Sequence, residues 1–224
     1  MNTGLIIAVV IASLIGFLLL ITSPLRWYNQ FNKRFNHVKK KRQAINTSQS
    51  QNQSLHKLWD LAGHGIFDHV TTYADFGTLL GLVRDSSLIA WDEDIDVWCW
   101  RDDFEKVLNL VQNTFGQKPE YQIFVEKISI LPCTPSIYVL NLNTGVHLDI
   151  HFRHLTNDGK LVHYSCHPKW LQAISINGYQ TLHSSKIFPS YMFMYRGHKI
   201  CIPIRAAEIL ENLYGHDWTQ PKRE

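Results

Sequence analysis

Two short motifs in the middle of the chain combine small residues and carboxylates in a way that suggests metal-dependent chemistry. A glycine turn at residues 77–81 (Gly-Thr-Leu-Leu-Gly) is followed by an acidic segment at residues 91–97 (Trp-Asp-Glu-Asp-Ile-Asp-Val). Side chains two positions apart on a strand lie on the same face, so Asp94 and Asp96 would project together. Adjacent carboxylates repel each other unless a cation lies between them, and such oxygen ligands suit Mg²⁺ or Mn²⁺. A site of this kind serves phosphoryl transfer on a nucleotide.

An acidic run also has a simpler interpretation as a solvated loop. Here the flanking residues favour the metal site, because Trp91 precedes the acids and residues 98–100 (Trp-Cys-Trp) follow them. A charge set into such an apolar stretch is costly unless it has a partner. We therefore predict a strand with a functional acidic face.

A third candidate carboxylate, Asp149, lies later in the chain within a His-Leu-Asp-Ile-His-Phe segment. Its apolar neighbours indicate a strand, on which Asp149 is either a solvent-facing residue or the partner of Asp94 and Asp96. Three convergent acids can hold two metal ions about 3.5–4 Å apart, which clamp a pyrophosphate or triphosphate. His147 and His151 could share the strand face of Asp149, but the sequence favours the carboxylates over a histidine metal site.

The segments around these motifs predict an α+β fold in which a mixed sheet is flanked by helices. Apolar residues at helical spacing and capping residues predict helices at residues 54–70, 78–83, 102–116 and 204–214. Short apolar runs bounded by turn residues predict strands at residues 92–97, 121–125, 128–131, 137–142 and 146–152. Both motifs therefore belong to one folded domain, which we expect to begin near Ser54.

The N-terminal segment predicts a membrane anchor in front of this domain. Residues 4–21 contain no charged side chain and approach the length of about 20 residues that crosses a bilayer as a helix. A cleaved signal peptide is the alternative, but no basic residue precedes the apolar run and no A-x-A site follows it. We divide the chain into an anchor at residues 1–23, a basic juxtamembrane and polar stem at 24–53, and a catalytic domain at 54–224.

The charge of the chain argues against a nucleic acid partner, and its cysteine spacing argues against a zinc site. The 224-residue chain has a formal net charge of +3, and many of its basic residues lie between Arg26 and Arg42. The rest is nearly neutral, so we expect no nucleic acid partner. Basic residues after the anchor favour a cytosolic domain, whereas N-x-S tripeptides at Asn46 and Asn52 favour a lumenal one, and both orientations stay open. The four cysteines lack the paired spacing of a zinc site.

These motifs resemble those of the LicD family, which includes bacterial phosphocholine transferases and the eukaryotic fukutin and fukutin-related proteins. The resemblance rests on G-T-L-L-G at residues 77–81, on Arg84, and on W-D-x-D-[IV]-D at residues 91–96. The family's later D-I-F is matched by residues 149–150, with His151 in place of Phe. The closing F-P, V-P and Y-G-x-x-W elements are similar to Phe188-Pro189, Ile202-Pro203 and residues 214–218.

This resemblance implies a polymerase-β-type nucleotidyltransferase fold and a phosphotransferase that needs Mg²⁺ or Mn²⁺. The enzyme would move a phospho-alcohol, of the phosphocholine or ribitol phosphate type, from a CDP-linked donor to a glycan hydroxyl. Asp94, Asp96 and Asp149 would be the catalytic metal ligands, and Asp149 could also accept the proton of the attacking hydroxyl. The residues expected to bind substrate are Gly77, Thr78, Arg84 and Asp92.

The apolar N-terminal segment implies a place in the cell, and the resemblance leaves alternative functions open. We expect a single-pass membrane protein that contacts the bilayer through residues 4–21, in the Golgi or ER membrane if the source is eukaryotic. A nucleotidyltransferase that makes a nucleotide-linked product, or an inactive glycan-binding scaffold, would fit the same fold. Lys106 and Arg153 are weaker phosphate candidates, whose simpler role is a solvated charge.

Overall fold

The structure is a computed structural model that describes residues 48–126, 135–162 and 181–221. Within these ranges no helix is both long and apolar enough to cross a membrane. The predicted anchor, much of the predicted stem and the predicted strand at residues 128–131 lie outside the described residues.

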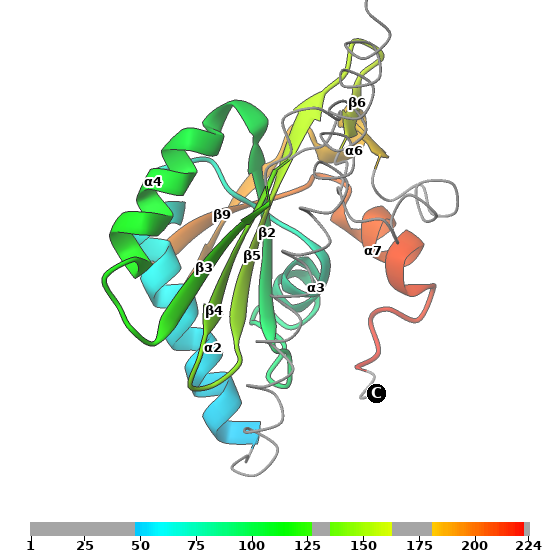
Figure 1. Cartoon of the computed structure of the whole chain (residues 1–224). Coiled ribbons are helices and arrows are strands. Elements are labelled where there is room, and N and C mark those ends of the chain that lie inside the picture. The colour runs from blue at the N-terminus through cyan, green and yellow to red at the C-terminus, as the bar shows by residue number, and fades with distance from the viewer. Residues whose placement is uncertain (1–47, 127–134, 163–180, 222–224) are drawn as a thin grey trace, which may run out of the picture.

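A nine-stranded mixed sheet forms the centre of the domain (Figure 1). Its main path runs β3-β4-β5-β2-β1-β9-β8, while β6 pairs with β5 and β7 pairs with β6. The pairs β2–β5 and β1–β9 are parallel, and the other described pairs are antiparallel. The strands are β1 (Tyr73–Ala74), β2 (Asp94–Trp100), β3 (Tyr121–Glu126), β4 (Ser136–Asn141), β5 (His147–Leu155), β6 (Lys160–Val162), β7 (Thr181–His183), β8 (Tyr191–Tyr195) and β9 (His198–Ile202).

Helices cover both faces of this sheet (Figure 1). One face carries α2 (Ser48–Ala62), which continues into the π-helical turn η1 (Gly63–Phe67), and α4 (Phe104–Phe115). The other face carries α3 (Phe76–Arg84) and α7 (Ala206–Tyr214). Two short elements complete the fold, the 3-10 turn η2 (Arg101–Asp103) and α6 (Ser184–Ile187). The predicted α+β fold with a mixed sheet between helices is therefore confirmed.

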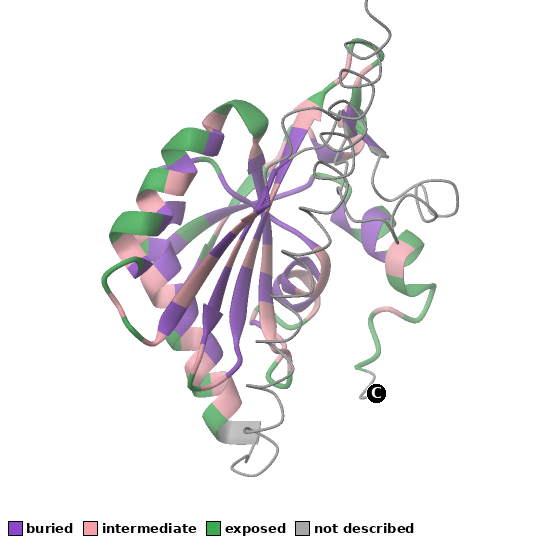
Figure 2. Cartoon of the chain, in the orientation of Figure 1, coloured by how far each residue is buried: buried purple, intermediate pink, exposed green. Residues whose placement is uncertain are grey.

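The core lies between the sheet and its helices, and the central strands are largely buried (Figure 2). On α4, buried residues recur every three or four positions, which is the spacing of one helix face. On β2, Ile95 and Val97 are fully buried, as the alternating pattern predicted. Leu148 and Ile150 are buried in the same way on β5, so on both strands the intervening acids face away from these core residues. The buried residues of α4 are Phe104, Val107, Val111 and Phe115.

The start of the domain differs from the prediction. The first described helix begins at Ser48 rather than near Ser54, so residues 48–53, which the prediction assigned to the polar stem, are helical. Their polar composition gave no sign of a fold, but Gln51 has a specific tertiary partner. Its Nε2 donates hydrogen bonds to the backbone oxygens of Asp92 at 2.8 Å and Trp91 at 3.1 Å. This end of α2 therefore holds the loop that leads into the acidic strand.

Candidate active site

Parallel pairing of β2 with β5 brings the three predicted carboxylates together. The register places Asp96 opposite Asp149 and Asp94 opposite His147. Ligand atoms of Asp94, His147 and Asp149 lie within 4.8 Å of one another, and the same holds for Asp96, Asp149 and His151. The site therefore contains both the three acids and the two histidines that flank Asp149. We call these five residues the carboxylate cluster.

The glycine turn lies against the carboxylate cluster. A Cβ atom added to Gly77 would lie 2.5 Å from Oδ2 of Asp92 and 3.8 Å from Oδ2 of Asp96, so any larger residue here would displace the Asp92 carboxylate. The hydroxyl of Thr78 accepts a hydrogen bond of 2.8 Å from the backbone N–H of Asp96. Phe76, just before the glycine, has a φ of 37°, a left-handed conformation that bulky residues rarely adopt. Strain of this kind is concentrated at functional sites.

Burial raises the pKa of three carboxylates at this site, Asp92, Asp96 and Asp149, and repulsion between acids adds to the shift for the first two. Burial, followed by the charge of Asp94, raises the pKa of Asp92 to about 8. The same two causes, with a contribution from Asp149, raise the pKa of Asp96 well above its usual value. Burial also raises the pKa of Asp149 to about 6, although the nearby His147 opposes this shift.

These properties fit a divalent cation. Among the described residues, Oδ1 of Asp149 is buried and has no hydrogen-bond partner, and it lies 3.7 Å from Nε2 of His147. A cation would relieve the repulsion between the carboxylates and supply the missing partner. Burial, followed by the charge of Arg153, lowers the pKa of His151 to about 4, so its imidazole is neutral and able to bind a metal. Mixed oxygen and imidazole donors suit Mn²⁺, and the carboxylates alone suit Mg²⁺.

Comparison with known proteins identifies the family of this chain. The model of the LicD/FKTN/FKRP nucleotidyltransferase domain matches residues 69–205, which include the whole carboxylate cluster and the glycine turn. The chain belongs to this LicD family. A comparison with curated proteins found no match. Among solved structures, the lincosamide antibiotic adenylyltransferase LnuA with lincomycin bound is similar at a TM-score of 0.40 and 18% identity, over 69% of this chain and 81% of that chain. That likeness is too weak to bear on function.

Membership of the LicD family supports a transferase. The three basic residues that the sequence suggested as phosphate ligands each contact another group of the domain. Arg84 forms a two-pronged ion pair with Asp85, with its Nε 2.9 Å from Oδ1 and its Nη2 2.7 Å from Oδ2. Lys106 donates to the backbone oxygen of His69 at 2.8 Å. Arg153 is buried and donates to Asp75 at 2.6 Å, so the expectation that it is a solvated charge was wrong.

Two features of the candidate site were not found from the sequence. The first is Asp75, which begins α3 and is buried with Arg153. The second is Tyr214 at the end of α7, whose phenol is close enough to the acids for their charge to raise its pKa, after burial as the main cause. Among these acids, Asp96 makes the largest contribution to the rise in the pKa of Tyr214. The Y-G-x-x-W element pointed to Tyr214 as a family feature but gave no sign that it lies near the acids.

Proposed function

We propose that this LicD protein is a metal-dependent phosphotransferase. It would move a phospho-alcohol, of the phosphocholine or ribitol phosphate type, from a CDP-linked donor to a hydroxyl of a glycan, and release CMP. The observation that supports this most directly is the convergence of Asp94, Asp96 and Asp149 beside the glycine turn at the start of α3. Membership of the LicD family agrees with transfer of a phosphorus-containing group.

The three carboxylates are the residues that would hold Mg²⁺ or Mn²⁺. Bound divalent ions would neutralise charge on the phosphate oxygens of the donor and orient them for displacement. His147 and His151 border the same ligand positions, so they either complete the coordination or position Asp149. Asp92 accepts a hydrogen bond of 2.9 Å from the backbone N–H of Glu93, and it is proposed to shape the donor site beside Gly77.

The chain itself would supply positioning and proton transfer. The start of α3 presents the turn formed by Gly77 and Thr78 to the carboxylate cluster, where backbone N–H groups at a helix N-terminus favour phosphate. Arg84 is proposed to bind a donor phosphate by exchanging Asp85 for the ligand. Asp149 is proposed to accept the proton of the attacking glycan hydroxyl, since proton acceptors in such reactions are positioned carboxylates.

The cellular setting remains part of the proposal. Residues 4–21 are proposed to anchor the enzyme in a bilayer, which would be the Golgi or ER membrane in a eukaryote. Anchoring would hold the enzyme close to a membrane-associated glycan acceptor.

A second candidate function is nucleotidyl transfer, in which a nucleotide-linked product is made and pyrophosphate is released. The domain description matched by residues 69–205 is that of a nucleotidyltransferase, and three carboxylates with a glycine turn would serve this chemistry equally well. The product identifies the reaction, because phospho-alcohol transfer from a CDP-linked donor yields CMP, whereas nucleotidyl transfer from CTP yields pyrophosphate.

The test is an assay of full-length protein in detergent with CDP-choline or CDP-ribitol, Mg²⁺ or Mn²⁺, and candidate glycans. We expect CMP release by the wild type, and no detectable turnover by Asp94→Asn and Asp96→Asn, which remain folded by circular dichroism. Asp158→Asn is the matched control, because this exposed acid lies in the turn between β5 and β6. Wild-type turnover in both cluster variants would end the proposal, and pyrophosphate release from CTP would favour the second function.

A further inference from the structure

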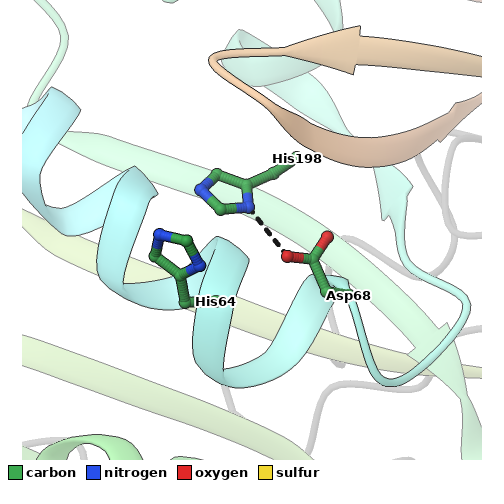
Figure 3. Close-up of side chains that lie close together, drawn as sticks. All are labelled: His64, Asp68 and His198. Carbon is green, nitrogen blue, oxygen red and sulfur yellow. Dashed lines mark hydrogen bonds and ion pairs between the residues drawn. The ribbon is translucent and has the colours of Figure 1, made fainter.

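A second group of metal-ligand side chains lies away from the carboxylate cluster. His64 and Asp68 come from η1 and its C-terminal end, and His198 begins β9 (Figure 3). They lie on the side of the sheet that α2 and α4 cover, whereas the carboxylate cluster lies beside α3. One ligand atom from each of the three residues lies within 4.8 Å of the others.

The three side chains point toward one another (Figure 3). Nδ1 of His198 forms a hydrogen bond of 2.9 Å with Oδ2 of Asp68. The imidazoles of His64 and His198 meet edge to face, with ring centres 4.3 Å apart and an angle of 83° between the planes. Ligand atoms about 2.0–2.1 Å from a tetrahedral zinc ion are roughly 3.3 Å apart. The pair formed by His198 and Asp68 is therefore already near the required separation.

The local backbone fixes this arrangement. A Cβ atom at Gly63 would lie 2.2 Å from Cγ of His198, so the missing side chain lets the buried imidazole lie directly against η1. His64 and Asp68 are four positions apart, which places both on one face of the helical turn. Short π-helical turns such as η1 occur frequently at functional sites. His64 is exposed, so its side chain can turn toward an ion at small cost.

We propose that His64, Asp68 and His198 form a site for a transition-metal dication of the Zn²⁺ class. Two imidazoles and one carboxylate are the donors of many zinc sites, and they leave a fourth position for water or another ligand. Mg²⁺ is a poor occupant because it prefers oxygen donors. The bound ion would join η1 to β9, which are 130 positions apart in the chain at the Asp68–His198 contact. This proposal does not depend on the transferase reaction.

A hydrogen bond between His198 and Asp68 would account for that pair without a metal. It does not account for the second imidazole, that of His64, which lies next to the pair and comes from one helical turn before Asp68. A purely structural pair and a metal site therefore differ in what they require of His64. The first does not need its imidazole, and the second loses a ligand when that imidazole is removed.

The test is calorimetric titration of the full-length protein in detergent with Zn²⁺, in the presence of excess Mg²⁺ to occupy the carboxylate cluster. We expect one Zn²⁺ equivalent to bind the wild type. His64→Ala and Asp68→Asn should weaken binding by at least about tenfold. Asp68→Asn keeps a hydrogen-bonding side chain beside His198, so it separates loss of the ligand charge from loss of the fold. His183→Ala is the control, because this exposed histidine lies outside the group.

Two further measurements make the result specific. An Asp94→Asn, Asp96→Asn double variant should still bind Zn²⁺ at this site. This result would show that the measured Zn²⁺ binding does not come from the carboxylate cluster. Zn²⁺ should raise the melting temperature of the wild type and of His183→Ala but not that of His64→Ala. Failure of the wild type to bind Zn²⁺, or unchanged affinity in both His64→Ala and Asp68→Asn, would overturn the proposal.

Discussion

Arg153 on β5 donates a hydrogen bond of 2.6 Å to Asp75, the residue that caps the N-terminus of α3, and both side chains are only 3% exposed. The other carboxylate oxygen of Asp75 accepts from the backbone N–H of Phe76 at 3.2 Å. The guanidinium of Arg153 also lies 5.3 Å from the centre of the Trp98 ring. One buried ion pair therefore fixes the glycine turn relative to the strand that carries Asp149.

Replacing Arg153 with methionine should destabilise the domain strongly, because it leaves a buried carboxylate without its cationic partner. Breaking a buried pair in this way typically costs about 3–5 kcal/mol of unfolding free energy. Denaturant titration measures the loss, and Asp75→Asn combined with Arg153→Met should recover part of it. Lys160→Met, which breaks an exposed pair with Asp158, should leave the melting temperature nearly unchanged. A loss below about 1 kcal/mol for Arg153→Met would show that the pair does not fix the turn.

Gly77→Ala should reduce turnover at least about tenfold while the protein stays folded, because the new methyl group would lie 2.5 Å from Oδ2 of Asp92. Steady-state kinetics and a melting curve on the same preparation separate the two effects. Gly197→Ala is a contrasting control, since that glycine has a φ of 83° and no atom within 4 Å of an added Cβ. This control should lose about 1 kcal/mol of stability without loss of turnover. Equal turnover of Gly77→Ala and the wild type would contradict the role of the close approach.

The stabilisation by Mg²⁺ should grow as the pH rises from about 6 to about 8. Asp92 has its pKa raised to about 8 and Asp149 to about 6, so without metal the folded state holds more protons than the unfolded state in this range. Metal-free stability therefore falls as the pH rises, whereas ionisation of the same acids strengthens Mg²⁺ binding.

Differential scanning fluorimetry with and without Mg²⁺ at each pH measures this difference. The shift in melting temperature should be larger at the higher pH in the wild type. It should be absent at every pH in the Asp94→Asn, Asp96→Asn double variant. A shift in the wild type that does not change with pH would show that the cluster is not the Mg²⁺ site.

We expect Tyr214→Phe to lower kcat/KM by about tenfold with little change in melting temperature, because the phenol lies within electrostatic range of four acids and its removal would take away a hydrogen bond to a bound substrate. The four acids that raise its pKa are Asp96, Asp92, Asp75 and Asp94. Tyr191→Phe is the control, since Tyr191 is 44% exposed on β8. If both variants match the wild type in kcat/KM, Tyr214 has no part in binding the substrate.

The sequence predicted the face shared by Asp94 and Asp96, because strand periodicity is local and needs no knowledge of the fold. The approach of Asp149 depends on parallel pairing of β2 with β5, and no local pattern encodes the register of two strands so far apart in the chain. From the residues alone, the meeting of Asp149 with Asp94 and Asp96 was one of two alternatives, and the resemblance to a family favoured it.

Other elements were missed for identifiable reasons. The hairpin of β8 and β9 was not predicted. Met192 and Met194 put apolar side chains on the exposed face of β8, where they are 56% and 60% exposed, so polar and apolar residues do not alternate along this strand. The early start of α2 depends on Gln51 bonding to a distant loop. Arg153 was taken for a surface charge, because charged residues are buried almost solely when a partner exists, and Asp75 could not be paired with it from sequence.

The alignment of β2 with β5 has a consequence for any preparation of the protein. Neighbouring side chains on a strand face opposite ways, so a slip of one position would turn Ile150 toward the acids and Asp149 into the core. A misaligned molecule would keep Asp94 and Asp96 on β2 but lose Asp149, His147 and His151 from the ligand set. The specific activity of a preparation would thus measure the fraction of molecules in which β2 and β5 are paired in the correct register.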